Sequence, residues 1–575
     1  MRLPRRLLFW TLFALLLLAR VGQAMSLEQA TAHDAPAKVA IVQSGALVPD
    51  DAEIERMVRQ ALDLAAKLEE LIGPGDVVVI KPNLVLDVSP ETGIVTDTRV
   101  VRTLVRIAQD MGAERVYIAE GSARYSSGDA NRDRYVTRHA FQVAGYDLDG
   151  DMVDDATGVP LVDLNISGEA VDARDPSYVT LVNVSTGLIR KEYWLPNLVL
   201  EADVLISVPV LKNHYLAGTT LGMKNMIGTA PNDIYHGPGE VCEKKELSHT
   251  DVELHQHIVD LNLARKPDLV VVDGLRGMTD GPIGSQIMDP PMGLILAGRD
   301  VVAVDTVGTL IMGYDPTSVP YLRMAEQVNL GTTDTAWIQA VGMSVAGVRR
   351  DFPAPYGEFP TTRAESQPPL TDITFPSDGG SLMESTQVLV EVRNDAGVAR
   401  VELYADNVLV GADRESPYEF TLNPDTYGLG PLRLRAVAYD RALNEATDQI
   451  MISIVSREPT STATTTTVAQ IPATPSPKGP WIEPSMTPSS LTTVEPRPIA
   501  TVTGLTVSPG VVKLTEEPMV QETDRPIPEP SSMTPTSDAV LCGLLLLIVI
   551  LAIAAGIGSA VVARSRSPQE GSRRF

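Results

Sequence analysis

Cysteine is almost absent from this chain, which has two in 575 residues. Cys242 stands in the middle of the sequence and Cys542 in an apolar run near its end, so an internal disulfide framework is not available. The sequence also has no CxxC signature for zinc or an iron–sulfur cluster. We therefore expect a hydrophobic core, rather than cross-links or a structural metal, to stabilise the fold.

Basic residues are also scarce, with 47 Lys and Arg against 73 Asp and Glu, which gives a formal net charge of -26. A polyanion of this kind is repelled by phosphate backbones, so this balance excludes nucleic acid as a partner. The chain is too long for one ordinary core, and two or more domains are expected.

The N-terminus has the three parts of a secretory signal peptide. A basic start at residues 1–6 precedes an apolar run at residues 7–19, and Gly22 and Ala24 supply the small residues that a signal peptidase needs. We predict a signal peptide at residues 1–24. An uncleaved anchor and twin-arginine export, which Arg5-Arg6 permits, are the alternatives.

The C-terminal part has the pattern of a stalk and an anchor. Residues 457–537 are rich in Thr, Pro and Ser, which predicts a disordered stalk. Residues 539–563 are uncharged and largely apolar, enough for one transmembrane helix, and the basic tail at 564–575 should lie in the cytoplasm. These segments predict a single-pass plasma-membrane protein with most of its chain extracytoplasmic. A buried core helix and a sorting signal removed by processing are the alternatives.

From residue 39 to about 345, short apolar strands alternate with amphipathic helices. A helix is expected at 51–72, where apolar residues recur on one face, and others at 98–111, 253–264, 300–312 and 316–328. Strands are expected at 38–43, 76–80, 115–119, 203–208, 268–273 and 293–297. This alternation predicts an α/β domain with a mainly parallel, helix-covered sheet, interrupted by a polar insertion or small subdomain at 147–196.

Residues 370–456 have a different pattern, with several short strands and no helix. This spacing predicts a small all-β sandwich. Its segments 401–411, 416–420 and 436–440 resemble bacterial immunoglobulin-like domains of cell-surface proteins. The resemblance implies contacts with other surface components.

Polar residues stand just beyond several of the expected strands. Because the carboxyl ends of parallel strands meet at one edge of a sheet, these side chains are candidates for a ligand site. Each alone could be a surface lysine, a turn asparagine or a helix cap, but together they favour a site. The candidates are Lys81, Asn83, Glu120, Ser122, Lys212, His214 and Asp273.

The segment 208–228 is too polar for a core element and too apolar for an ordinary loop. Its glycines permit close approach of backbone, and Lys212 and Lys224 could hold an anionic group that Asn225 orients. We expect a small anionic ligand, with Lys224, His214 and His236 as catalytic residues.

Five of the seven histidines fall between His214 and His257, which raises the hypothesis of a divalent metal held by His214 and His236. His255 and His257 are two apart on an expected helix and so point to different faces, and no HExxH motif is present. Surface and capping histidines are the alternative.

An ordered set of motifs then resembles one family over about residues 39–345. The motifs are Ile80-Lys-Pro-Asn83, Ala119-Glu-Gly-Ser122, Val208-Pro-Val-Leu-Lys-Asn-His214, Gly222-Met-Lys-Asn-Met-Ile-Gly228 and Val271-Val-Asp-Gly274. They resemble the family called domain of unknown function 362, which implies the fold and the site positions but no reaction. Some members carry an iron–sulfur module, and this chain lacks the cysteines for one. The layout is also similar to that of nickel-pincer lactate racemases, as an analogy of fold.

The sequence thus predicts a metal- or cofactor-dependent enzyme that acts on a small anionic substrate outside the membrane. A non-catalytic surface binding or adhesion protein is the alternative, and a purely structural surface component is a third. The reaction and the substrate stay open.

Overall fold

The computed structural model describes residues 35–129, 132–133, 135–166, 172–239, 243–248, 250–284, 286–354, 362–394 and 397–456. The expected signal peptide, stalk, transmembrane helix and tail lie outside these ranges. Within them, no helix combines the length and the apolar character needed to cross a membrane.

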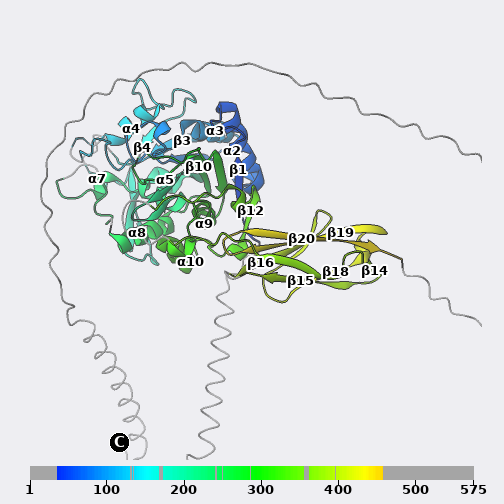
Figure 1. Cartoon of the computed structure of the whole chain (residues 1–575). Helices are drawn as coiled ribbons and strands as arrows, with labels where there is room; N and C mark the ends of the chain where they lie inside the picture. The colour runs from blue at the N-terminus through cyan, green and yellow to red at the C-terminus, as the bar shows by residue number, and fades with distance from the viewer. Residues whose placement is uncertain are drawn as a thin grey trace, which may run out of the picture. The chain divides into compact units, whose positions relative to one another are not determined.

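One large sheet organises the first domain (Figure 1). Its strand order is β12 (Ile338–Gly342), β1 (Ala37–Gln43), β11 (Leu294–Gly298), β10 (Leu269–Met278), β7 (Val204–Val208), β2 (Val77–Pro82), β3 (Arg115–Glu120) and β4 (Leu161–Asp163). Beyond β7, β8 (Val210–His214) continues beside β10 and pairs with β9 (Gly218–Thr220). Neighbours along the main path are parallel, except that β11 is antiparallel to both β1 and β10.

Helices cover both faces of this sheet, as Figure 1 shows. On one face α2 (Asp51–Ala65), α3 (Thr98–Asp110) and α4 (Val136–Ala144) pack against strand residues such as Ile80. On the other face, Leu296 belongs to the core that includes α8 (Asp251–Ala264), α9 (Val301–Ile311) and α10 (Pro320–Gln327). The shorter helices are α5 (Asn197–Glu201), α6 (Gly222–Asn225), α7 (Asn232–Tyr235) and α11 (Val345–Val348).

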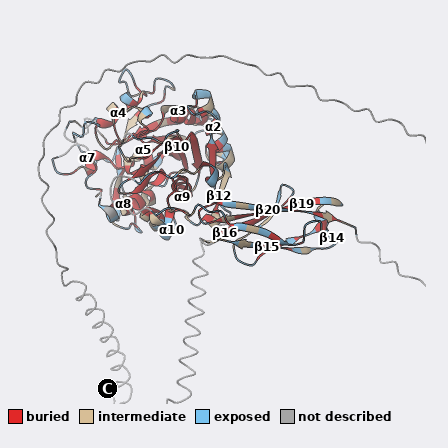
Figure 2. Cartoon of the chain, in the orientation of Figure 1, coloured by how far each residue is buried: buried red, intermediate tan, exposed pale blue. Residues whose placement is uncertain are grey.

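The strands are apolar on both sides because both sides are covered. The four residues Val78, Val79, Ile80 and Lys81 of β2 are all buried, and the interior of the domain is uniformly red in Figure 2. The expected α/β domain with a mainly parallel sheet is therefore confirmed.

Local details differ from the sequence expectation. The helix expected at 51–72 ends at Ala65, because Lys67 adopts a left-handed conformation (φ 49°) that an α-helix cannot continue through. In the polar region 147–196, β4 extends the main sheet, whereas β5 (Val179–Asn183) and β6 (Glu192–Pro196) form a separate antiparallel pair.

The second region is all-β, as expected. One sheet has the order β13 (Leu370–Phe375), β15 (Thr386–Arg393), β18 (Tyr418–Leu422). The other has the order β14 (Ser381–Leu382), β20 (Glu445–Ile454), β19 (Gly430–Asp440), β16 (Val398–Ala405), β17 (Val408–Asp413). Along β18, Tyr418, Phe420 and Leu422 are buried and alternate with exposed residues, which is the pattern of a strand with one face in a core.

Candidate functional site

A buried ion pair lies where β2 and β3 end. The two strands are adjacent and parallel, with Ile80 opposite Ile118, so Lys81 and Glu120 lie within one step of each other in register, in the last residues of the two strands. Lys81 Nζ lies 2.9 Å from the Glu120 carboxylate, and both side chains are almost completely excluded from solvent. Glu120 also accepts hydrogen bonds from the backbone N–H groups of Leu84 and Gly121. The pair therefore fixes the strand exits to each other.

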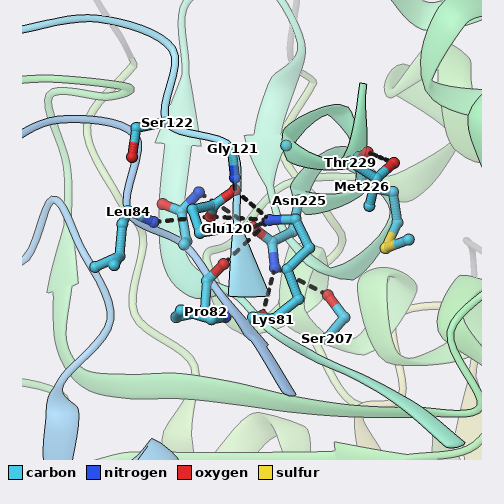
Figure 3. A network of polar contacts seen from close by, with 12 residues as sticks. Lys81, Pro82, Leu84, Glu120, Gly121, Ser122, Ser207, Asn225, Met226 and Thr229 are labelled. Atoms are coloured by element: carbon cyan, nitrogen blue, oxygen red, sulfur yellow. Dashed lines mark hydrogen bonds and ion pairs between the residues drawn. The ribbon is translucent and has the colours of Figure 1, made fainter. Parts of the chain in front are cut away.

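Asn225, at the end of α6, connects this pair to the rest of the site (Figure 3). Its Oδ1 accepts hydrogen bonds from Lys81 Nζ and Asn83 Nδ2, both at 3.2 Å. Its Nδ2 donates to the Lys81 carbonyl at 3.2 Å and to Ser207 Oγ at 3.0 Å. The amide thus uses all of its hydrogen-bonding capacity within the protein, and it ties α6 to β2 and β7.

Two more lysines are buried close by, and uncharged oxygens hold both. Lys212 Nζ donates to Asn83 Oδ1 at 2.8 Å and to the carbonyls of Ile94 and Pro282. Lys244 Nζ donates to Asn165 Oδ1 at 3.3 Å and to the carbonyls of Gly121, Gly228 and Ala230. An ammonium has three N–H groups, and those of Lys81, Lys212 and Lys244 all donate to oxygen atoms of the protein.

Lys224 differs from these three lysines. It is half-buried on α6, and it makes no hydrogen bond or ion pair to any residue in the described part of the chain. Burial and the nearby charge of Lys81 lower its pKa to about 8. The Lys224 amine is therefore the one among the four that is available to a ligand.

Burial lowers the pKa of the other three lysines as well. For Lys81 the Glu120 carboxylate opposes this effect, and for Lys212 the charge of Lys224 adds to it. The pKa of Lys244 falls to about 7, chiefly because the ammonium is desolvated. Several ammonium groups are thus held together at an electrostatic cost, which is a common mark of functional sites.

Lys81, Lys224 and Lys244 line a cavity of about 550 Å³. Val85, Ile227 and Ile283 give it an apolar side. Its charged lining residues are five cationic ones and two acidic ones, a formal excess of three positive charges. They are Lys81, Arg124, Lys224, Lys244 and Lys245, with Glu120 and Glu243.

Two glycines allow the close packing behind the cavity wall. A β-carbon at Gly228 would overlap Lys81 Nζ and Glu120 Oε1, and one at Gly121 would overlap the Gly228 carbonyl. Backbone therefore approaches the ion pair more closely than any other residue type permits.

His214 lies in the cavity wall, but its Nδ1 is already engaged by the protein backbone. Nδ1 accepts hydrogen bonds from the backbone N–H groups of Leu216 at 3.0 Å and Ala217 at 3.1 Å. A neutral ring in this arrangement carries its proton on Nε2, so Nε2 is a donor and not a metal ligand.

The structure does not bring His236 to the same wall. His236 is outside the cavity lining, and its Nδ1 lies 2.9 Å from the Gly237 carbonyl. A cationic lining with an N–H-bearing histidine does not fit a divalent metal ion, which needs lone pairs and negative charge.

Of the ten candidate residues from the sequence, six line the cavity: Lys81, Asn83, Glu120, His214, Lys224 and Asn225. Lys212 supports the wall through Asn83. Ser122 and Asp273 are buried elsewhere: Asp273 accepts hydrogen bonds from the N–H groups of Asp97 and Leu275. Burial and the charge of Asp97 raise the Asp273 pKa to about 6.

The sequence interpretation did not include Arg124, Glu243, Lys244 and Lys245. Three of them belong to an irregular segment after His236, where no strand or helix pattern directs attention. The adjacent basic pair Lys244-Lys245 in an otherwise acidic chain is the signal that would have found them.

A group of three acidic residues lies outside this cavity. One carboxylate oxygen from each of Asp147, Asp149 and Asp151 falls within 4.8 Å of the others, the sole such group of three metal-ligating residue types in the described ranges. Asp147 is the buried member, and it accepts hydrogen bonds from the backbone N–H groups of Gly150 and Met152.

Comparisons with known proteins agree with the two domains. Residues 78–309 match the family model described as Domain of unknown function (DUF362), and residues 369–450 match that of the Bacterial Ig domain. The chain therefore contains a DUF362 domain followed by a bacterial immunoglobulin-like domain, which confirms the resemblance seen in the motifs.

One curated relative is the thylakoid-associated protein sll1697 of Synechocystis sp., 28% identical over 284 residues, which are 48% of this chain and 75% of that protein. Among solved structures, the lactate racemase apoprotein of Thermoanaerobacterium thermosaccharolyticum is 14% identical, covers 48% of this chain and 57% of its own, and has a TM-score of 0.28. The fibronectin(III)-like modules of Clostridium thermocellum CbhA are 20% identical, cover 16% of this chain and 100% of their own, and have a TM-score of 0.14.

Proposed function

We propose that the α/β domain binds a small anionic ligand in the lysine cavity and acts on it as an enzyme. The observation that carries this proposal is the charge of the lining: five cationic side chains face two acidic ones, in a chain with a net charge of -26. Like charges held together in a desolvated place repel one another, and an anion relieves that repulsion.

The available hydrogen-bond donors suit the same ligand. Lys224 has no partner in the described part of the chain, and Arg124 Nε is buried without a hydrogen-bond partner there, 3.6 Å from Glu243 Oε1. Both side chains line the cavity, and the apolar lining residues Val85, Ile227 and Ile283 can contact a carbon skeleton. A small carboxylate or phosphate compound matches this combination of donors and apolar surface.

Binding of small anions to the full-length protein tests the proposal. Thermal melts and titration calorimetry with acetate, propionate, pyruvate and inorganic phosphate should show that at least one anion stabilises the protein, more weakly as salt rises. Lys224→Met should lose most of this effect. Lys67→Met is the matched control, because Lys67 is exposed and pairs with Glu70. If no anion stabilises the wild type, or if both variants lose binding equally, the cavity is not an anion site.

A non-catalytic surface-binding role is the second candidate, and the immunoglobulin-like domain favours it because such modules display a neighbouring domain. To distinguish the two roles, a bound anion is incubated with the protein and mass spectrometry shows whether the anion has changed chemically. An anion that binds and is recovered unchanged under all cofactor conditions supports the binding role.

We also propose that the protein is anchored in the plasma membrane, with both domains extracytoplasmic and the immunoglobulin-like domain able to contact other surface components. The apolar run at 539–563 and the signal-like N-terminus support this location. Truncation before Asp538 should release the protein into the soluble fraction. Retention of the truncated protein in carbonate-washed membranes would contradict the proposal.

A further inference from the structure

We propose that Lys224 forms an imine with its ligand, and that this ligand is a small anion with an aldehyde or ketone group, such as a 2-oxo carboxylate. This inference rests on the proposed function of the same cavity and adds the substrate class and the covalent step.

The first reason is the geometry of the four lysines. The ammonium groups of Lys81, Lys212 and Lys244 each donate to three or more protein oxygens, and Lys81 is also paired with Glu120. A nucleophile needs space to reach a carbonyl carbon, and protein oxygens surround the nitrogens of these three, including Lys244, whose pKa of about 7 is also low. Lys224 lines the cavity and has no partner in the part of the chain that the structure describes. It is therefore the amine that can reach a bound molecule.

Lys245 is the remaining lysine of the lining. It is half exposed, and its Nζ lies 3.5 Å from Glu243 Oε2. An ammonium that is bound to a carboxylate in this way is a poor nucleophile. Lys245 can attract an anion to the entrance, whereas Lys224 sits next to the buried cations.

The second reason is the charge around Lys224. Lys81 on β2 and Lys212 on β8 are cations that interact with Lys224. The carboxylate of Glu120 in the same cavity is bound to Lys81 and to two backbone N–H groups, and that of Asp305 is bound to the N–H groups of Gly222 and Met223. A lysine that is desolvated next to another cation loses its proton readily and becomes a nucleophilic amine near neutral pH. Consistent with this, the pKa of Lys224 falls to about 8.

The step balances without an oxidant or a reductant. The neutral Lys224 Nζ adds to the carbonyl carbon, and one proton passes from this nitrogen to the former carbonyl oxygen to give a carbinolamine. The C–O bond then breaks, one water leaves, and the C=N bond forms, with one proton from solvent when the imine is protonated. Arg124, whose Nε makes no hydrogen bond in the described part of the chain and lies 3.6 Å from Glu243 Oε1, can bind the carboxylate of the same molecule. The protonated imine then withdraws electrons from the neighbouring carbon, as carbonyl-transforming lysine enzymes require.

Reductive trapping tests the imine in the full-length protein. The protein is incubated with pyruvate, reduced with sodium borohydride, digested and mapped by mass spectrometry. We expect a 1-carboxyethyl group on Lys224, with at least a tenfold higher yield than on any other lysine. The yield should rise between pH 6 and pH 9 as the amine loses its proton. Lys224→Arg, which keeps the charge but not the nucleophile, should give no adduct at this site, and Lys67→Arg should match the wild type.

A ligand without a carbonyl separates this inference from the proposed function. Propionate has the carboxylate of pyruvate but cannot form an imine. If both anions stabilise the wild type but no adduct is trapped with pyruvate, 2-oxoglutarate or glyoxylate, the imine is refuted and anion binding stands. If no anion binds, the proposed function fails as well. Equal labelling of Lys224 and exposed lysines such as Lys67 also overturns the inference.

Discussion

The carboxylate of Asp305 accepts a hydrogen bond of 2.7 Å from the backbone N–H of Gly222, and so ties α9 to the first residue of α6. Its second oxygen accepts a bond of 3.0 Å from the N–H of Met223. Because α6 carries Lys224 and Asn225, this buried carboxylate positions two residues of the cavity wall without lining it.

This arrangement predicts a pH-dependent contribution of Asp305 to stability. Burial raises its pKa from 3.8 to about 7, so between pH 4 and pH 7 the folded protein keeps a proton that the unfolded chain has lost. Stability from this group therefore falls as pH rises through that window, and it is constant above it. In Asp305→Asn this contribution is absent. In urea denaturation, the unfolding free energy of the wild type relative to that of Asp305→Asn should therefore decrease from pH 5 to pH 8.

The control for this effect is an exposed carboxylate. Asp175→Asn should give the same difference from wild type at both pH values, because Asp175 is a surface residue whose pKa is lowered by bonds to Ser177 and lies below the tested range. A pH-independent difference for Asp305→Asn would show that its carboxylate ionises as in solvent.

Replacement of Lys224 should stabilise the fold while it removes the function. The folded-state pKa of about 8 lies below the ordinary value of 10.5, so at pH 7 the protein carries a charge in an unfavourable place. Lys224→Met should raise the unfolding free energy at pH 7 by about 1–3 kcal/mol. The gain should shrink as pH rises from 8 to 10, because the wild-type amine becomes neutral. A variant less stable than wild type at pH 7 would mean that Lys224 has a structural partner.

Mutation of one partner of the Lys81–Glu120 pair should lower the stability of the protein strongly. Glu120→Gln leaves the Lys81 ammonium buried without a counter-charge and should lower the unfolding free energy by about 3–5 kcal/mol. The double variant Lys81→Met with Glu120→Gln should lose less than the sum of the single losses, as measured in a double-mutant cycle. Strictly additive losses would show that the two side chains do not interact.

Gly228 should tolerate no side chain. The β-carbon of Gly228→Ala would overlap the Lys81–Glu120 pair, and the strain should cost about 1–3 kcal/mol of unfolding free energy and weaken anion binding. Gly45→Ala is the matched control, because a β-carbon at Gly45 would meet no atom within 4 Å and the φ of Gly45 is not positive. Its stability should stay within about 0.5 kcal/mol of wild type. Equal effects of both changes would contradict the close approach at Gly228.

The sheet edge could be predicted from the sequence because its strands are unambiguous. The β-branched run at 76–80 locates β2 and the run at 115–119 locates β3, so Lys81 and Glu120 were expected near the carboxyl ends of these strands, which prove to be neighbours. The direction of a side chain beyond a strand is not encoded in such a run. Where a strand ends is not always clear either: β10 continues to Met278, so Asp273 lies within the strand, and its carboxylate accepts a hydrogen bond from the N–H of Asp97.

The hydrogen-bond partners of each candidate side chain could not be predicted from the sequence. Lys81, Lys212 and Lys224 are equivalent as letters, yet only the folded structure reveals that the first two are saturated by protein oxygens. Lys244 was missed because its segment has no periodicity, and its place in the site depends on contacts with Gly121 and Ala230, which are distant in sequence.

The reversed strand β11 has a consequence for engineering. Because β11 runs against β1 and β10, its carboxyl end faces the edge opposite to the one where Lys81 and Glu120 emerge. The chain after Gly298 therefore starts at the opposite end of the sheet, and the following helix, α9, brings Asp305 to the backbone N–H groups of Gly222 and Met223. Substitutions on the β12 side of the sheet can accordingly tune heat resistance or solubility, while changes along β2, β3 and β8 act directly on the cavity wall.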